Sequence, residues 1–428
     1  MARNRTRVAS PDHDQVDSDD RDDLDALLDD EEPRRSRTAR AVRGLVLVVV
    51  LLVLAFYLGG GWYFSGQLRA QALDVAPETY VDSLRLTTIG HGQVSITAPD
   101  PGEHRVLTSG STYGIGWSGG YGQVSGPATA GPHASVVRSI RILAGGSPTA
   151  GTPAHLDIDA FPADPARVFG GSAREVAFTS GGNQVPAWFV PGRGGRSTGT
   201  WAVLVHGQGD SRAAMLRLMR DTHAAGLPSL AISYRNDVGA PADRSGFYQY
   251  GRTEWHDLAG AVDYAKAHGA DHLVLVGYSM GGGIVASYLE HVPDGPPVRA
   301  VVMDAPMLDL DATVRLGAGE TALPVLGHVP DSLTWVAERI STLRFRLDWR
   351  AVDYLRDTSW LRVPALVLHG MDDATVPLST SLRLRDAQPD RVRLLTFPGA
   401  GHVASWNIDT PRYDAAVRAF LREVTPLH

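Results

Sequence analysis

The chain contains no cysteine. This absence excludes disulfide bonds, catalysis by a thiolate, and zinc or iron–sulfur sites that use cysteine ligands. Three further patterns are missing from the sequence: the His-Glu-x-x-His metal motif, the phosphate-binding P-loop and a strand-linked dinucleotide fingerprint. We therefore expect neither a metal ion nor an organic cofactor, and no nucleic-acid partner is indicated.

Aromatic residues are absent from residues 1–40, which are instead rich in Asp, Glu and Arg. Acidic runs at residues 17–25 and 29–32 contribute much of the net charge of −7, so this charge says little about the substrate. A segment of this composition buries too little apolar surface to fold alone. Residues 1–44 are therefore predicted to be a disordered cytoplasmic tail, with docking of a partner as an alternative role.

Charged residues are also missing from residues 45–64, a stretch long enough to cross a hydrocarbon core of about 30 Å. Arginine is concentrated before it, at Arg34, Arg35, Arg37, Arg40 and Arg43, whereas Arg69 alone follows closely. The positive-inside rule then places the N-terminus in the cytoplasm and the rest of the chain outside. Trp62 and Tyr63 suit the outer interface of the membrane.

A cleaved signal peptide is the competing interpretation of this stretch. Residues 70–72, Ala-Gln-Ala, resemble a small-residue processing site. The long leader before the apolar stretch favours an uncleaved anchor. We therefore expect a single-pass protein of the cell membrane, anchored through residues 45–64, with an extracytoplasmic catalytic domain.

The pattern Gly-x-Ser-x-Gly occurs around Ser118, Ser197 and Ser279. Ser118 and Ser197 lie in Gly- and Ser-rich stretches that are typical of flexible turns. Ser279 follows a short apolar strand, residues 273–276, and precedes a predicted helix, residues 281–291. A strand, a sharp turn and a helix form a nucleophile elbow, in which small residues let the strand and the helix approach closely. Ser279 is therefore the candidate nucleophile.

A serine hydroxyl becomes a good nucleophile only when a neighbouring base takes its proton. His402 directly follows the strand-like residues 391–397 and lies on a loop long enough to lean over the sheet, so it is the candidate base. Four other histidines follow the serine and are interpreted as surface or structural groups: His291, His328, His369 and His428.

The acid that orients this base is sought in residues 366–377, where Asp373 fits the spacing Gly-x-x-Asp-x-x-Val-Pro. The adjacent Asp372 is interpreted as a turn cap or a solvated side chain. Asp304, at the end of the strand-like residues 301–303, is a further alternative acid, although its expected role is to hydrogen-bond its loop. Asp373 is therefore the candidate acid.

These segments resemble the α/β-hydrolase superfamily, in the branch with Gly-x-Ser-Met-Gly-Gly elbows and His-Gly-x-x-Asp-x-x-Val-Pro acid loops. The likeness covers the chain from about residue 174 to its C-terminus. It includes a His-Gly loop, residues 206–210, after the apolar residues 201–205. The resemblance implies that the backbone N–H groups of Gln208 and Met280 hold the oxyanion of the reaction.

Apolar strands alternate with amphipathic helices through the same region. Strands are expected at residues 201–205, 230–234, 273–276, 301–303, 365–368 and 393–397, and helices at residues 211–225, 254–267, 281–291, 377–387 and 410–424. This alternation predicts an α/β fold, a mainly parallel sheet with helices on both faces and catalytic groups at the carboxyl ends of the strands. Residues 175–178 and 185–189 are predicted to form an antiparallel hairpin at its edge.

Two regions interrupt or precede this pattern. Short β-like pieces separated by Gly, Pro, Ser and Thr predict a small β-rich accessory region at residues 65–172. Residues 173–428 are assigned to the hydrolase domain. A helical cap insert is expected at about residues 307–362, and in this superfamily such inserts commonly cover the active site.

The sequence thus predicts a membrane-anchored serine hydrolase that cleaves ester or related acyl bonds through an acyl-enzyme. A carboxylesterase that acts on a small-molecule acyl ester is the first choice, and a prolyl-oligopeptidase-like peptidase is the second. A non-catalytic binding module on a hydrolase scaffold is a third hypothesis. The acyl-group size, the leaving group and the oligomeric state stay open.

Overall fold

The computed structural model describes residues 32–76, 79–90, 92–195, 199–292, 298–323 and 327–425. The acidic runs, Ser197, residues 324–326 of the insert and His428 lie outside the described residues, apart from Glu32. The chain divides into two compact units, Met1–Gly60 and Gly61–His428.

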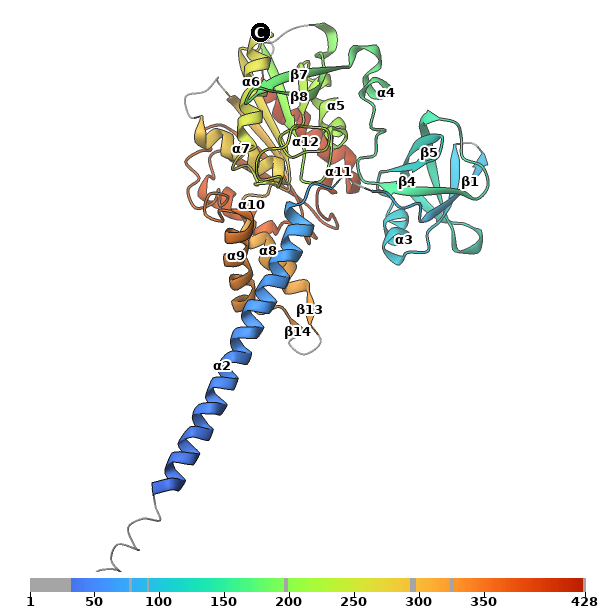
Figure 1. Cartoon of the computed structure of the whole chain (residues 1–428). Helices are drawn as coiled ribbons and strands as arrows, with labels where there is room; N and C mark the ends of the chain where they lie inside the picture. The colour runs from blue at the N-terminus through green and yellow to red at the C-terminus, as the bar shows by residue number, and fades with distance from the viewer. Residues whose placement is uncertain are drawn as a thin grey trace, which may run out of the picture. The chain divides into compact units, whose positions relative to one another are not determined.

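In the first unit, the described residues belong to one long helix, α2 (Glu32–Leu68), shown in blue in Figure 1. It begins before residue 45, so residues 32–44 are helical where a disordered tail was predicted. Arginine and alanine are strong helix formers and extend the helix in this direction. The large apolar side chains from Val42 to Leu54 are at least 46% exposed. By length and composition, the helical residues Arg37–Leu73 are able to cross a membrane.

The second unit begins with the end of this helix, which widens into a π-helical turn, η1 (Arg69–Leu73). Leu73 is fully buried in the core of the C-terminal α/β domain. Its carbonyl accepts a hydrogen bond from the backbone N–H of Tyr248 at 3.0 Å, and the next residue, Asp74, forms a β-bridge with Phe247. Residues 69–74 are therefore anchored on the C-terminal α/β domain.

Six strands close into a small barrel after this segment, in the order β1-β2-β5-β4-β3-β6 (Figure 1). Their bounds are β1 Leu84–Gly90, β2 Gln93–Thr97, β3 Tyr113–Trp117, β4 Gly120–Ala130, β5 Val136–Gly145 and β6 Thr152–Asp157, with helix α3 at Pro101–Thr108. Alternating residues such as Leu84 and Leu86 fill its interior. A short 3-10 turn, η2 (Pro132–Ala134), precedes β5.

Strands β3 and β4 lie where the sequence predicted none, because their glycines hide the apolar alternation. Those glycines make room for neighbouring rings. A Cβ on Gly114 would meet the ring of Tyr121, and one on Gly116 would meet the ring of His155. Ser118 lies in the tight turn that joins the two strands. This Gly-x-Ser-x-Gly match is therefore part of a hairpin.

The C-terminal α/β domain is built on an eight-stranded sheet with the order β16-β15-β12-β11-β9-β10-β8-β7. The strands β9 to β12, β15 and β16 pair in parallel, whereas β8 and β7 are antiparallel at one edge. Their bounds are β7 Arg174–Ser180, β8 Asn183–Val190, β9 Thr200–Val205, β10 Ser229–Ile232, β11 His272–Tyr278, β12 Val298–Asp304, β15 Ala365–Gly370 and β16 Val392–Phe397.

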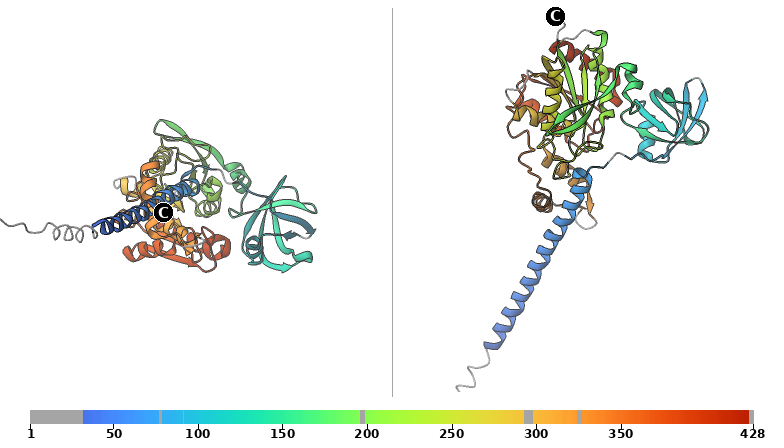
Figure 2. Two further views of the ribbon diagram at one scale, coloured as in Figure 1. Left: turned by 60° about the horizontal axis from the view of Figure 1, so that its bottom comes forward. Right: turned by 45° about the horizontal axis from the view of Figure 1, so that its top comes forward.

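Helices cover both faces of this sheet (Figure 2). One face packs against α6 (Trp255–Ala267), α7 (Met280–His291) and α10 (Leu378–Ala387), and the other against α5 (Leu216–Ala224), α11 (Ser405–Ile408) and α12 (Thr410–Val424). In β9, Val203 faces the first core, while Ala202 and Leu204 face the second. Burial on both faces explains the near-continuous apolar strands.

The insert between β12 and β15 contains two longer helices, α8 (Leu310–Glu320) and α9 (Asp331–Phe345). A two-stranded ribbon, β13 (Ala322–Leu323) with β14 (Gly327–His328), lies between them. The remaining short helices are α4 (Pro165–Phe169), η3 (Gly170–Ser172), η4 (Arg193–Gly195) and η5 (Arg212–Met215).

Candidate active site

Ser279 lies at the sharp turn between β11 and α7. Its φ of +48° and ψ of −119° are unusual for a residue with a side chain. Two flanking glycines make this turn possible, because a Cβ on Gly277 would lie 2.6 Å from backbone atoms of Gly281, and a Cβ on Gly281 would lie 2.1 Å from the carbonyl oxygen of Val205. The strain is held by neighbours: the Ser279 N–H donates to the carbonyl of Asp304 at 3.0 Å.

Three predicted site residues meet at the carboxyl ends of three strands. Nε2 of His402 lies 2.9 Å from Oγ of Ser279, and Nδ1 of His402 lies 2.8 Å from Oδ2 of Asp373. Ser279 and Asp373 are nearly buried, whereas the side chain of His402 is 21% exposed. Serine, imidazole and carboxylate are thus connected in series, although they are far apart in the sequence.

Asp373 is held as an anion by the groups around it. Its Oδ1 accepts hydrogen bonds from the backbone N–H groups of Thr375 and Val376, both at 2.8 Å. Nε2 of the fully buried His369 lies 3.4 Å from Oδ2. Burial alone would raise the pKa of Asp373, but its contacts with His369, His402 and the backbone outweigh burial and hold the pKa well below its usual range. The alternative acid, Asp372, is exposed.

Asp304 takes a different position, at the end of β12. It is fully buried, and its Oδ2 accepts a hydrogen bond from the hydroxyl of Tyr413 at 2.9 Å. Burial raises the pKa of Asp304 to about 6, and this effect outweighs the opposing influence of Arg217 and Tyr413. The imidazole of His402 is oriented by Asp373 rather than by Asp304.

The raised pKa of Asp304 predicts a pH-dependent stability. Between about pH 4 and pH 6 the folded protein holds a proton on Asp304 that the unfolded chain has released. The stability that the folded state owes to this bound proton is therefore lost as pH rises through this window. The Asp304→Asn variant should lack this decline, which amounts to about 2–3 kcal/mol. Urea unfolding of both proteins at several pH values measures it. Parallel stability profiles of the two proteins would contradict the assignment.

The loop after β9 passes directly beside the serine. A Cβ on Gly207 would lie 3.2 Å from the Cβ of Ser279. Both polar atoms of the Gln208 side-chain amide are hydrogen-bonded. Its Nε2 donates to the carbonyl of Gln71 at 3.0 Å, and its Oε1 accepts from the hydroxyl of Tyr250 at 3.3 Å. Met280 is the first residue of α7. The two predicted oxyanion donors thus belong to the segments that flank Ser279.

A buried ion pair supports this loop. His206 is fully buried, its Nε2 lies 3.0 Å from Oδ2 of Asp237, and its Nδ1 lies 2.8 Å from the carbonyl oxygen of Gly207. Burial lowers the pKa of His206, but the carboxylate of Asp237 outweighs it and the pKa is raised. Tyr234 donates to the same Gly207 carbonyl at 2.7 Å and its ring stacks on the imidazole. Neither Asp237 nor Tyr234 was predicted to belong to the site.

The loop that carries His402 is tied to the barrel. Asn407, which is buried, donates through Nδ2 to the carbonyls of Thr112 and Ile158, both at 2.8 Å. The buried guanidinium of Arg217 donates to Oδ1 of Asn407 at 2.8 Å and to the carbonyl of Val403 at 3.2 Å. No local sequence pattern reveals these residues, because their partners are distant in the chain.

These contacts predict that Asn407 positions the histidine loop. Asn407→Ala leaves two partly buried carbonyls and part of the Arg217 guanidinium without a partner, so we expect a loss of stability of about 1–3 kcal/mol. We also expect kcat to fall by up to about 100-fold through misplacement of His402. Denaturant unfolding and ester turnover measure the two effects. Asn183→Ala, at the exposed first residue of β8, is the control and should change neither.

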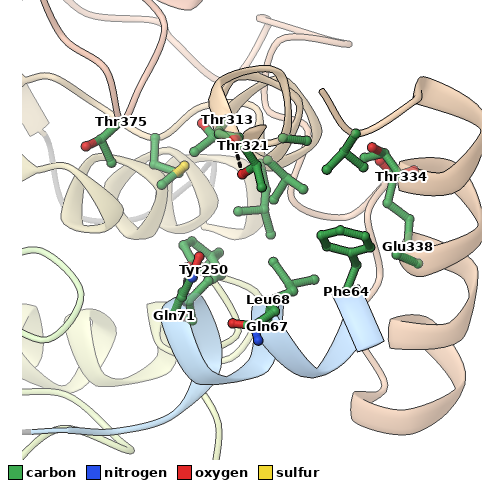
Figure 3. A pocket seen from close by; sticks show the side chains of 18 of the residues that line it. Phe64, Gln67, Leu68, Gln71, Tyr250, Thr313, Thr321, Thr334, Glu338 and Thr375 are labelled. Carbon is green, nitrogen blue, oxygen red and sulfur yellow. Dashed lines mark hydrogen bonds between the residues drawn. The ribbon is translucent and has the colours of Figure 1, made fainter. Parts of the chain in front are cut away.

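A cavity of about 410 Å³ lies next to these groups (Figure 3). Its walls come from the end of α2 and η1, from α8 and α9 of the insert, and from the loops around the serine. The residues that line these three walls include Phe64, Gln67, Leu68, Gln71, Gln208, Tyr250, Met307, Leu310, Thr313, Val314, Gly317, Ala318, Ala337, Glu338 and Thr375. Within the described parts of the chain, no three His, Asp or Glu side chains are grouped so as to hold a metal ion.

Sequence comparisons place the domain among known hydrolases. The sequence model of the prolyl oligopeptidase family matches residues 236–426. Human protein ABHD12B is 27% identical over 209 residues, which cover 46% of this chain and 53% of that protein, so the chain spans about half the length of this relative. The 2-hydroxy-6-oxo-2,4-heptadienoate hydrolase of Pseudomonas putida is 28% identical over 240 residues, covering 48% of this chain and 83% of that enzyme.

Among solved structures, the Pyrococcus furiosus esterase Pf2001 aligns with a TM-score of 0.47 and 19% sequence identity, over 61% of this chain and 95% of that one. The matched family model and the Pseudomonas putida relative are both hydrolases. The chain is a member of the α/β-hydrolase superfamily, as the resemblance of its motifs predicted.

Proposed function

We propose that the protein is a membrane-anchored serine hydrolase that cleaves carboxylic esters through an acyl-enzyme. The hydrogen-bonded series Ser279, His402 and Asp373 carries this proposal. His402 accepts the hydroxyl proton of Ser279 through Nε2 as Oγ attacks the ester carbonyl. Asp373, which stays ionised, accepts the hydrogen bond from Nδ1 and stabilises the imidazolium that forms.

The remaining steps follow from the same groups. The tetrahedral intermediate places its oxyanion near the backbone N–H groups of Gln208 and Met280, each contributing about 3 kcal/mol in comparable systems. His402 then protonates the leaving alcohol, and the acyl group stays on Ser279. Water, deprotonated by His402, attacks the acyl-enzyme. The bond between the acyl carbon and Oγ of Ser279 then breaks, His402 returns the proton to Oγ, and the acid is released.

The anchor and its orientation are part of the proposal. Residues 45–64 would span the bilayer, and the arginines before them would hold the N-terminus in the cytoplasm. The hydrolase domain is then extracytoplasmic. Protease added to intact cells should digest this domain. Digestion that occurs only after permeabilisation would reverse the assigned orientation.

A fluorophosphonate probe tests the activated serine directly. The full-length protein in detergent should react with the probe, and mass spectrometry of the labelled peptides should locate the adduct on Ser279. Ser118, which fits the same Gly-x-Ser-x-Gly pattern, is an internal control and should remain unlabelled. Folded protein that neither reacts with the probe nor hydrolyses an aryl ester would instead support a non-catalytic binding role.

A peptidase is the second candidate, favoured by the match of residues 236–426 to the prolyl oligopeptidase family. The two functions differ in the bond that is broken. A comparison of kcat/KM for aryl esters and for chromogenic proline-containing peptides separates them. We expect the esters to be preferred, and a preference for the peptides would replace the first proposal with the second.

A further inference from the structure

The cavity beside the serine has one wall made of the chain that directly follows the apolar stretch. Phe64 is the last residue of this uncharged stretch, and it lines the cavity together with Gln67, Leu68 and Gln71 (Figure 3). These side chains point from successive turns of one helix into the same space. The end of the proposed membrane anchor is therefore part of the cavity itself.

This wall is fixed to the hydrolase domain at both ends. At the N-terminal end of the wall, the guanidinium of Arg344 lies 3.9 Å above the centre of the Trp62 ring. It also donates a hydrogen bond to the Ser65 hydroxyl at 2.6 Å. At the other end, the carbonyl of Ala72 accepts from the Tyr250 hydroxyl at 2.7 Å. The helix end is thus held against the insert and the domain, as a structural wall requires.

The opposite walls are formed by α8 and α9 of the insert. Five of their lining residues are small or apolar: Leu310, Val314, Gly317, Ala318 and Ala337. Thr313 and Thr334 also line the cavity, and their hydroxyls donate to the carbonyls of Asp309 and Pro330. Glu338 also lines the cavity, but its carboxylate is ion-paired with Arg315 at 3.2 Å. The polar side chain of Gln208 is likewise engaged, by Gln71 and Tyr250. The walls from α8 and α9 therefore offer mainly apolar contact to a ligand, and they face the polar side chains of Gln67 and Gln71.

The same cavity borders the groups proposed to perform the reaction. Gln208 is a proposed oxyanion donor, and the backbone N–H of Met307 donates to the carbonyl of Ser279 at 2.9 Å. Thr375, a third lining residue, donates its backbone N–H to Asp373 at 2.8 Å. The cavity thus extends from the neighbourhood of the reacting carbonyl to the end of the apolar helix.

We propose that this cavity binds the acyl chain of a long-chain ester that enters from the lipid bilayer, with residues 63–72 as one wall of the binding site. The proposal rests on the proposed function, because the ester carbonyl must lie at Ser279. Three observations carry it: the apolar lining, the volume of about 410 Å³, which lies within the range of small-molecule sites, and the origin of one wall at the end of the apolar stretch. A short ester leaves most of this space unused.

Two glycines of α8 provide a matched pair for the test. A Cβ built on Gly317 or on Gly319 meets no atom within 4 Å, so leucine fits at either position without a clash at Cβ and improves the helix propensity. Gly317 lines the cavity, whereas Gly319 does not. Gly317→Leu therefore fills space that the acyl chain would occupy, and Gly319→Leu controls for the change in the helix.

The experiment uses the full-length protein reconstituted in phosphatidylcholine vesicles, with acetyl and palmitoyl esters of the same fluorogenic alcohol. We expect the wild type to prefer the palmitoyl ester. Each methylene that loses its contact weakens binding about fourfold, so Gly317→Leu should lower kcat/KM for the palmitoyl ester at least tenfold. The acetyl ester should change less than about twofold, and Gly319→Leu should change neither. An equal loss for both esters, or no loss, overturns the proposal.

A binding measurement separates this proposal from the proposed function. A fluorescent long-chain fatty acid is titrated into the Ser279→Ala protein, alone and combined with Gly317→Leu or with Gly319→Leu. Weaker binding with Gly317→Leu alone supports the cavity assignment even if no ester is hydrolysed, an outcome that would refute the proposed reaction. Hydrolysis of the acetyl ester combined with undetectable binding of the fatty acid would refute the cavity assignment and leave the reaction standing.

Discussion

Replacing Ser279 with alanine is expected to lower kcat for ester hydrolysis by about 10⁶-fold, because no other group at the site can form the acyl-enzyme. His402→Ala should cause a loss of similar size, since the serine is then without its base. The two residues act as a unit, joined by a hydrogen bond of 2.9 Å. The double variant should therefore be no slower than either single variant.

Stopped-flow and steady-state turnover of an aryl ester measure these losses, and circular dichroism checks that each variant is folded. Ser118→Ala is the control, because it alters the same motif in the turn between β3 and β4. We expect Ser279→Ala to retain a rate about 10³–10⁴-fold above that of the uncatalysed reaction in water, because the oxyanion donors and substrate binding remain. Losses that multiply in the double variant would show that serine and histidine do not act on one step.

Much of the hydrolase domain was predictable because its strands are buried on both faces. Val274, Leu275 and Val276 form a continuous apolar run, and all three are fully buried in β11. A continuous apolar run of this kind is recognised from neighbouring residues alone, without knowledge of the distant residues that pack against it. The candidate site followed from the same regularity, since Ser279, Asp373 and His402 each come directly after a predicted strand.

The accessory region was less predictable because its backbone is shaped by glycine. In β3, Gly114 and Gly116 leave space for the rings of Tyr121 and His155, so the strand carries no alternation of apolar and polar side chains. The register of the barrel is set by these long-range contacts. Only strands with fewer glycines, such as β2 (Gln93–Thr97) and β5 (Val136–Gly145), were predicted from their composition.

The contacts that connect distant parts of the chain could not be predicted at all. Asn407 bonds to carbonyls near residues 112 and 158, and Gln208 bonds to the carbonyl of Gln71. A single asparagine or glutamine has no periodicity from which its partner is inferred. Both bonds nevertheless act on the candidate site, the first through the loop of His402 and the second through the loop of Gly207. The barrel and η1, which follows α2, are thereby joined to the groups proposed to react.

Asp373→Asn is expected to lower kcat by about 10⁴-fold while leaving the fold intact. The carboxylate now accepts a hydrogen bond from Nδ1 of His402 at 2.8 Å and so keeps Nε2 free to accept the serine proton. An amide at this position favours the opposite tautomer, in which Nε2 carries a proton. It also removes the negative charge that stabilises the imidazolium. The loss should appear in kcat, with KM changed little.

Two matched carboxylates decide whether this effect belongs to Asp373 alone. Asp372→Asn changes an exposed neighbour, and Asp304→Asn changes the buried carboxylate that accepts its hydrogen bond from Tyr413. Both variants should retain kcat within about tenfold of the wild type, since neither group orients His402. A loss of about 10⁴-fold in Asp304→Asn with a small loss in Asp373→Asn would transfer the orienting role to the end of β12. The imidazole would then have to turn away from the partner that it contacts in the structure.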